Sequence, residues 1–316
     1  MSSARVSAGR AAFQALPQHR QGLLGVTGAA VLWSSGGLFI KWVSLDALGV
    51  TMWRSLLAGL TIYLIARPPL VKPWRAGRLT WGLALSYAAT MLLFVTATKT
   101  TTAANAIFLQ YTAPLYLLVL GAAVLGERAT RLDVATVAVA FGGMGLFFVG
   151  RLETDEVWGN VAALGSGVTL AIMMLLLRHK GCGPHTRPQA MVLGNALLVA
   201  GLLAVNLLRG AGAVFTPDVS DVAGLLFLGI VQIGIAYVLF AFAMTHVQAL
   251  EASLIGMLEP VLNPVWVFIF LGETPGWWAV LGGAILVIAV GIRTWITERG
   301  RPAGDLSDLV VLSAET

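Results

Sequence analysis

Charged residues are scarce in this chain. Only 11% of its 316 residues are Asp, Glu, Lys or Arg, whereas 58% are hydrophobic. A soluble domain carries roughly 25% charged residues. So few charges cannot cover a water-facing surface, which excludes an ordinary soluble protein. Most of the surface must therefore face lipid.

The residue patterns of several catalytic classes are also missing. The single cysteine, Cys182, permits no internal disulfide. The sequence contains neither an H-E-x-x-H metal helix nor a G-x-x-x-x-G-K-[ST] phosphate loop. The histidines fall in tails, loops or at predicted helix ends, and the apolar segments contain no paired aspartates. These absences argue against an intramembrane hydrolase and direct use of ATP, so we expect no enzyme activity, metal or cofactor.

A basic excess is present but is not concentrated. The chain has 20 Lys and Arg against 15 Asp and Glu, for a formal net charge of +5. The arginines are dispersed over short loops instead of gathering on one face. This distribution indicates membrane topology and not binding of nucleic acid.

Long apolar segments are what the chain has in abundance. A helix needs about 20 residues to cross a bilayer core, and the alternation typical of a barrel is absent. We therefore predict an all-α polytopic membrane protein with ten transmembrane helices and read the first segment as an uncleaved helix. The predicted segments are residues 22–43, 48–66, 80–98, 103–125, 133–150, 158–178, 189–208, 221–244, 250–271 and 277–296.

The distribution of Lys and Arg predicts the orientation. If the N-terminus is cytoplasmic, most basic residues lie on the inner side, in keeping with the positive-inside rule. The outer ends then hold only Lys41, Arg54, Lys99, Arg151 and Arg209. We expect both termini in the cytoplasm and a bacterial-type inner membrane around the protein.

One apolar stretch occurs twice in the sequence, as an internal repeat. Ala103–Glu127 aligns without gaps with Ala249–Glu273, so that Pro114 meets Pro260 and both stretches end in Leu-Gly-Glu. Such self-similarity indicates a two-repeat protein. We divide the chain into an N-terminal tail (1–21), a first repeat (22–150), a second repeat (151–296) and a C-terminal tail (297–316). With five helices in each, the repeats would be inverted, an architecture typical of secondary transporters.

The order of these features resembles the EamA-type carriers of the drug/metabolite transporter superfamily. The matching residues are Leu32-Trp33-Ser34-Ser35-Gly36-Gly37 followed by Lys41, Arg54 in the second segment, and the two proline-containing helices that end in Leu-Gly-Glu. The likeness covers residues 22–296. It implies ten helices, a central cavity lined by helices 1, 3, 4, 6, 8 and 9, and export of small metabolites. Amino-acid exporters, including aromatic amino-acid exporters of the YddG type, belong to this family.

Glu259 is the first candidate for the transport site. It lies about nine residues into the ninth segment, and an ionised carboxylate at that depth costs on the order of 3 kcal/mol on insertion scales. Such a group should face a cavity or be protonated. It could contact a substrate amine or couple transport to protons, or it could satisfy backbone groups released by the neighbouring prolines.

Other polar and aromatic residues of the apolar segments complete the candidate site. Ligand pockets combine an apolar wall with a few polar groups, although interhelical hydrogen bonding would also explain each residue taken alone. The candidate substrate-binding residues are Trp33, Ser34, Tyr87, Gln110, Tyr111, Ser166, Thr169, Gln232, Tyr237, Glu259 and Asn263. Candidate helix hinges are Pro114, Pro260 and Pro264, since proline removes a helical hydrogen bond.

Three basic residues could form an outer vestibule that attracts carboxylates. They are Lys41, Arg54 and Lys99, although snorkelling of long side chains to the interface would also explain them. Arg54 is the strongest candidate of the three because apolar residues flank it on both sides.

We therefore predict a secondary transporter that exports small metabolites, with amino acids the preferred class, through alternating access. A sugar-nucleotide or phosphate-ester exchanger is the alternative within carriers, and a channel or scaffold the alternative outside them. The expected partners are a small-molecule substrate and the lipid bilayer. Small residues one turn apart, Ala138 with Gly142 and Ala279 with Gly283, permit close helix contact, so the protein could be a monomer or a weak homodimer.

Overall fold

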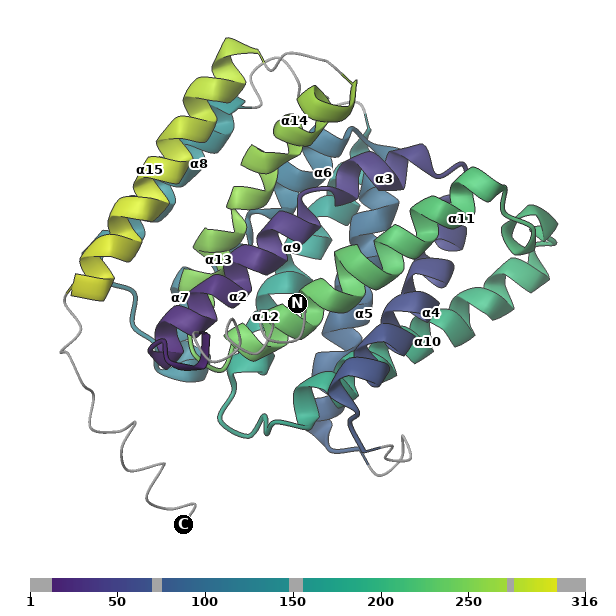
Figure 1. Cartoon of the computed structure of the whole chain (residues 1–316), viewed down its shortest axis with the longest axis horizontal. Coiled ribbons are helices and arrows are strands. Elements are labelled where there is room, and N and C mark those ends of the chain that lie inside the picture. Colours follow the sequence, from purple (N-terminus) through teal and green to yellow (C-terminus); the bar gives the residue numbers. More distant parts are fainter. Residues whose placement is uncertain (1–12, 70–75, 148–155, 272–275, 300–316) are drawn as a thin grey trace, which may run out of the picture.

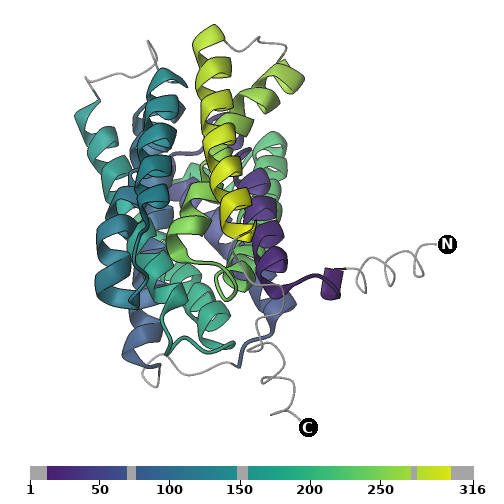
Figure 2. The same cartoon turned by 90° about the vertical axis from the view of Figure 1, so that its left-hand side faces the viewer.

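The computed structural model describes residues 13–69, 76–147, 156–271 and 276–299. All regular structure within these ranges is helical. The helices pack side by side as a bundle (Figures 1 and 2). In chain order they are α2 (Gln18–Trp33), α3 (Gly36–Trp42), α4 (Ala47–Ala66), α5 (Arg78–Thr100), α6 (Ala103–Gln110), α7 (Ala113–Leu125), α8 (Arg131–Phe147), α9 (Val157–Arg178), α10 (Thr186–Leu208), η2 (Gly212–Phe215), α11 (Val219–Leu226), η3 (Phe227–Ile235), α12 (Ala236–Ala243), α13 (Ala249–Gly256), α14 (Leu258–Leu271) and α15 (Trp277–Arg299).

Eight stretches of the described chain are long and apolar enough to cross a membrane. They coincide with eight of the ten predicted segments. The other two predicted segments, residues 133–150 and 250–271, correspond to α8, which is 17 residues long, and to the pair α13 and α14, of 8 and 14 residues. The all-helical membrane class is confirmed, whereas ten membrane-crossing helices remain a prediction.

Several predicted spans are interrupted near the middle of the bundle. The first breaks at Ser34 and Ser35, whose hydroxyls donate to the carbonyls of Val31 and Leu32 in the preceding turn. Such local side-chain bonds compete with the regular helical pattern. Two further spans are also interrupted: Tyr111 and Thr112 separate α6 from α7, and Met257 separates α13 from α14.

Proline explains where the helices resume after two of these breaks. Pro114 is the second residue of α7, and Pro260 is the third residue of α14. Proline fits the first turn of a helix because the backbone donors there have no intrahelical acceptor. Pro264 lies further along α14, and its side chain falls outside the described residues.

Glycine permits a close helix contact at Gly194, where α10 crosses α5. A Cβ added there would lie 2.7 Å from the carbonyl oxygen of Ala84 and 2.8 Å from Cδ1 of Tyr87. We expect Gly194→Ala to destabilise the protein by about 1–3 kcal/mol through overpacking. The matched control is Gly201→Ala on the same helix, where nothing lies within 4 Å of the added Cβ. Thermal unfolding in detergent should therefore separate the two variants, and equal melting temperatures would contradict the close packing.

Polar contacts join helices at the bundle end that carries Arg209. Arg209 forms an ion pair with Asp46, which caps α4. A hydrogen bond from the Arg209 guanidinium holds the pKa of the Asp46 carboxyl below its usual value. Nearby, the backbone N–H and the hydroxyl of Ser44 both donate to Asp221, at 2.8 and 2.5 Å. We refer to this end, with Asp46, Asp221 and Arg209, as the Arg209 end.

A buried ion network joins helices at the opposite end. Arg293 of α15 pairs with Asp133 of α8 at 2.9 Å and with Glu251 of α13 at 2.6 Å. His19 of α2 lies between Glu251, at 2.9 Å, and Glu298, at 2.5 Å. The start of α2 and the end of α15 therefore lie together. We refer to this end as the Arg293 end.

Candidate functional site

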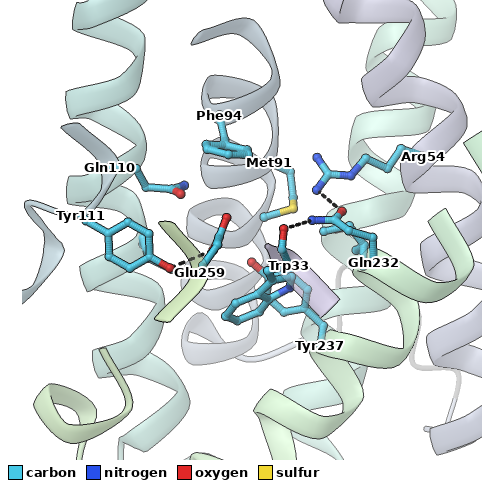
Figure 3. Close-up of a pocket in the computed structure, with 11 residues that line it drawn as sticks. Trp33, Arg54, Met91, Phe94, Gln110, Tyr111, Gln232, Tyr237 and Glu259 are labelled. Carbon is cyan, nitrogen blue, oxygen red and sulfur yellow. Dashed lines mark hydrogen bonds between the residues drawn. The ribbon is translucent and has the colours of Figure 1, made fainter. Parts of the chain in front are cut away.

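A cavity of about 40 Å³ lies inside the bundle. At roughly 10–15 Å³ for each water-sized group, it has room for about three such groups in this conformation. Its walls come from α2, α4, α5, α6, α9, η3, α12 and α14 (Figure 3). The lining residues are Trp33, Arg54, Met91, Phe94, Gln110, Tyr111, Leu170, Gln232, Ile233, Tyr237 and Glu259.

The acidic side of the cavity is built where two helix breaks meet. Tyr111 follows α6, and its hydroxyl oxygen lies 2.6 Å from the carbonyl oxygen of Gly256, the last residue of α13. The same hydroxyl lies 2.8 Å from Oε2 of Glu259, which is only 6% exposed. Both breaks therefore deliver polar groups to one point, and the buried carboxyl has a defined hydrogen-bond partner.

The basic side is formed by Arg54 and Gln232. Nη2 of Arg54 donates to Oε1 of Gln232 at 2.7 Å, and Nε2 of Gln232 donates to the carbonyl oxygen of Trp33 at 3.3 Å. Gln232 belongs to η3, a π-helix, and such wide turns often occur at functional sites. A Cβ on Gly36 would lie 2.5 Å from Nε2 of Gln232, so a side chain at that position would displace the amide. Figure 3 shows Arg54 and Gln232 on one side of the cavity, with Tyr111 and Glu259 on the other.

Aromatic rings form the wall between these two sides. The ring of Trp33 lies 5.0 Å from that of Tyr237 and 4.9 Å from that of Phe240. Tyr87 packs edge-on against Tyr237 at 5.0 Å. Aromatic pairs at these distances favour edge-to-face and tilted arrangements, which restrict the orientation of each ring. The cavity is therefore polar at two points and apolar between them.

The structure brings together six of the eleven predicted substrate-binding residues as lining of the cavity. These six are Trp33, Gln110, Tyr111, Gln232, Tyr237 and Glu259. The geometry places them around one space, and their role in binding remains a prediction.

The other five predicted residues do not line the cavity. Ser166 accepts a hydrogen bond from Gln110 at 2.6 Å, and Thr169 lies 2.9 Å from the hydroxyl of Thr90. Of the other three, Ser34 accepts from Trp266 at 2.6 Å, Tyr87 accepts from Asn195 at 3.0 Å, and Asn263 lies on α14 with a buried Oδ1 that has no partner among the described residues. Ser166 thus contacts a lining residue directly.

The three predicted vestibule residues do not share one location in the structure. Arg54 lines the cavity, whereas Lys41 and Lys99 do not. Nζ of Lys41 donates to the carbonyl oxygen of Thr101 at 2.9 Å, and Nζ of Lys99 donates to that of Val43 at 2.6 Å. Each lysine therefore joins the end of α3 to the end of α5. The residue patterns gave no sign of these two bonds because both acceptors are backbone atoms.

Four apolar lining residues are absent from the predicted site: Met91, Phe94, Leu170 and Ile233. In a sequence that is 58% hydrophobic, an apolar residue that faces a cavity looks the same as one that faces lipid. Of these four, only Phe94 was marked by the internal repeat. If the gap-free alignment that pairs Ala103 with Ala249 is extended upstream, Phe94 pairs with Phe240. In the described part of the chain, no group of three or more His, Cys, Asp or Glu lies close enough to hold a metal ion.

Within the described residues, an all-helical bundle with many apolar spans and a cavity lined by both polar and apolar groups is typical of an integral membrane protein of the transporter class. Comparison with protein families agrees, since the EamA-like transporter family matches residues 20–149 and again residues 157–294. The chain belongs to the EamA-like transporter family. The resemblance noted from the Trp33 region, Arg54 and the duplicated proline helices is therefore confirmed.

Several curated relatives are named as transporters. Two uncharacterized transporters of Archaeoglobus fulgidus are 26% identical over 272 residues and 28% identical over 281 residues. These alignments cover 86% and 84% of this chain, and 95% and 94% of the relatives. A probable terminal-alkyne amino-acid exporter of Streptantibioticus cattleyicolor is 30% identical over 183 residues, which is 56% of this chain and 59% of that protein.

A solved crystal structure has the same fold. It superposes with a TM-score of 0.73 at 19% sequence identity and covers 89% of this chain and 99% of its own. At this identity the likeness concerns the fold alone.

Proposed function

We propose that this transporter is a secondary carrier that exports small metabolites, with amino acids the preferred class, by alternating access around the cavity. The observation that carries the proposal is the cavity itself, which has a buried carboxyl on one side, a buried guanidinium on the other, and aromatic rings along the wall between them. Such a lining suits a small amphipathic solute with polar groups better than a bare ion. The name of the Streptantibioticus relative supports the choice of amino acids.

The proposed architecture is two inverted repeats of five membrane-crossing helices, residues 22–150 and 151–296, flanked by tails 1–21 and 297–316. Support comes from the double match to the family. Support also comes from the contact of Glu127, two residues beyond α7, with the backbone N–H of Ala249, the first residue of α13. The end of one copy of the repeated stretch thus meets the start of the other, as expected if the copies run in opposite directions.

Alternating access requires that the two ends of the bundle open in turn. At the Arg209 end, closure would depend on the bonds of Lys41 and Lys99 to backbone carbonyls. At the Arg293 end, it would depend on the network of Arg293 with Asp133 and Glu251. Since the cavity has room for only about three water-sized groups, an amino acid requires the surrounding helices to move apart. Pro114, Pro260 and Pro264 are the proposed hinges for this motion.

The positive-inside rule supports a cytoplasmic Arg293 end, with both termini inside and a bacterial inner membrane around the protein. In this orientation the Arg209 end faces outward. Transport would be driven by the solute gradient or by protons carried on Glu259. Arg54 is the one Lys or Arg among the lining residues, which gives a sugar-nucleotide or phosphate-ester exchanger less support.

Counterflow in proteoliposomes tests the proposal. Vesicles loaded with an unlabelled amino acid should transiently accumulate the same labelled amino acid from outside, because a carrier exchanges solute across the membrane. The screen should include amino acids, nucleosides, sugar nucleotides and amphipathic cations. A channel would equilibrate the label without accumulation, and counterflow of sugar nucleotides alone would favour the exchanger.

A further inference from the structure

Two arginines of this chain are equally buried but differently partnered. Arg54 and Arg293 are each 3% exposed. All three guanidinium nitrogens of Arg293 bond to carboxylates: Nε and Nη2 to Asp133, and Nη1 to Glu251. Arg54 has one bond, from Nη2 to the neutral amide of Gln232, and its Nε and Nη1 have no partner among the described residues. Arg54 therefore carries donors that the folded chain leaves unused.

Burial makes this difference significant. A buried charge is costly unless it is paired and hydrogen-bonded. No carboxylate of the described residues lies within 4.0 Å of the Arg54 guanidinium, although the same chain supplies two to Arg293. Glu259 is in the same cavity but on its other side (Figure 3). The space between the two groups is where a ligand would bind.

The fully buried side-chain atoms of the lining residues that have no partner among the described residues are all donors. They are Nε and Nη1 of Arg54 and the indole Nε1 of Trp33, each buried and without a partner among the described residues. An indole N–H and a guanidinium can only donate, whereas an ionised carboxylate can only accept. A carboxylate is therefore a ligand group that complements them, and Arg binds carboxylates through paired N–H groups.

We propose that Arg54 is the carboxylate anchor of the transport site, with Trp33 as a second donor and Glu259 receiving the ammonium group of the same solute. The inference rests on the proposed function and narrows its substrate class to solutes that carry a free carboxylate and an amine, as α-amino acids do. Met91, Phe94 and Leu170 then face the side chain of the solute. An amine without a carboxylate would leave the Arg54 donors unused and bring a second positive charge beside them.

Matched acids and amides test the anchor on the wild-type protein. Thermal unfolding in lipid nanodiscs is followed with each standard L-amino acid and with the corresponding L-amino-acid amide, which keeps the amine and loses the carboxylate. We expect at least one acid to raise the melting temperature while its amide does not, with at least about tenfold weaker binding of the amide, because hydrogen bonds to a charged group are strong. The proposal that Arg54 anchors a carboxylate would be overturned if each acid and its amide raised the melting temperature equally. It would also be overturned if no acid raised the melting temperature.

Variants separate binding from a structural role. Arg54→Met should lose the acid-specific stabilisation and melt at or above the wild-type temperature, because it removes a poorly paired buried charge. Arg293→Met is the matched control and should melt well below wild type, because two buried carboxylates, Asp133 and Glu251, lose the guanidinium that bonds both of them. Arg54→Lys keeps the charge and loses the paired N–H geometry, so we expect it to retain weak acid binding. If Arg54→Met and Arg54→Lys both melt as low as Arg293→Met, Arg54 has a structural role and the proposal is overturned.

The counterflow screen distinguishes failure of this inference from failure of the proposed function. If a nucleoside or an amine shows counterflow that is unchanged in Arg54→Met, the protein is a carrier but Arg54 is not a carboxylate anchor. Absence of counterflow for every solute of the screen would contradict the carrier itself. Counterflow of an amino acid that Arg54→Met abolishes supports both.

Discussion

Replacing Glu259 by Gln is expected to leave a folded protein whose counterflow falls by about 10- to 100-fold. A charge-assisted hydrogen bond contributes about 1.5–3 kcal/mol, which corresponds to one to two factors of ten. Glu259 is the one carboxylate among the lining residues, so no neighbour on the cavity wall can replace it. The variant would lose the proposed contact to a substrate amine and also the capacity to carry a proton.

The geometry around Tyr111 explains why the variant should fold. The hydroxyl of Tyr111 has one proton and lies within hydrogen-bond distance of two oxygens, the carbonyl of Gly256 and Oε2 of Glu259. If that proton goes to Gly256, a protonated Glu259 can donate to the tyrosine oxygen. The side-chain amide introduced by Glu259→Gln can donate to the same oxygen, so the substitution reproduces the protonated arrangement in a permanent form.

Counterflow and thermal unfolding should be measured together on Glu259→Gln and Tyr111→Phe. The phenylalanine variant removes the hydroxyl but keeps the carboxyl, so we expect it to reduce transport less than Glu259→Gln. A Glu259→Gln variant that melts like wild type and transports at the wild-type rate would remove Glu259 from the site. A variant that fails to fold would instead assign the carboxyl to the stability of the α13–α14 break.

The sequence reveals the membrane class of the fold because that information is local. A run of apolar residues predicts a helix wherever it occurs, and eight of the ten predicted segments coincide with candidate spans of the structure. The positions of Pro114 and Pro260 likewise indicated where the helices would be irregular. Both helices do break a few residues before the proline. Features that depend on a single segment were thus predictable.

The cavity depends on contacts between distant segments, and the sequence predicted it only in part. Glu259 stood out because a carboxylate is costly in lipid, and its partner Tyr111 is 148 residues away. Arg54 was grouped with Lys41 and Lys99 because all three are basic and near helix ends. Only the packing of α4 against η3 places Arg54 beside Gln232, 178 residues away. Residue type therefore identified candidates, but the tertiary structure assembled them.

The Arg293 network shows the same limit at the bundle end. Read alone, Arg293 is one more basic residue in favour of a cytoplasmic C-terminus, and Glu251 is a residue that complements a helix dipole. In the structure they are paired at 2.6 Å, with Glu251 only 1% exposed. Asp133 is 160 residues from Arg293, and no periodic pattern links the two. A buried ion pair between distant helices leaves no local trace in the sequence.

We expect the largest loss of stability from a single substitution when Arg293 of this network is replaced. Arg293→Met leaves Asp133 and Glu251 buried without the partner that bonds both of them. Removing one partner of a buried pair costs about 3–5 kcal/mol, because the remaining charge is uncompensated. We expect a marked fall in melting temperature in detergent. The control is Arg20→Gln, since Arg20 is 61% exposed where it pairs with Glu298, and exposed pairs contribute little.

A triple substitution separates lost pairing from lost packing at the same position. Arg293→Met combined with Asp133→Asn and Glu251→Gln removes the two carboxylates that bond to Arg293 while it keeps the shortened side chain. If the charges cause the loss, the triple variant should recover much of the wild-type melting temperature, because neutral replacements of buried ion pairs are often tolerated. A triple variant as unstable as Arg293→Met would mean that the volume and shape of the arginine hold α8, α13 and α15 together. In that case the arginine would stabilise the Arg293 end through packing, and the proposed opening of this end would not depend on breaking ion pairs.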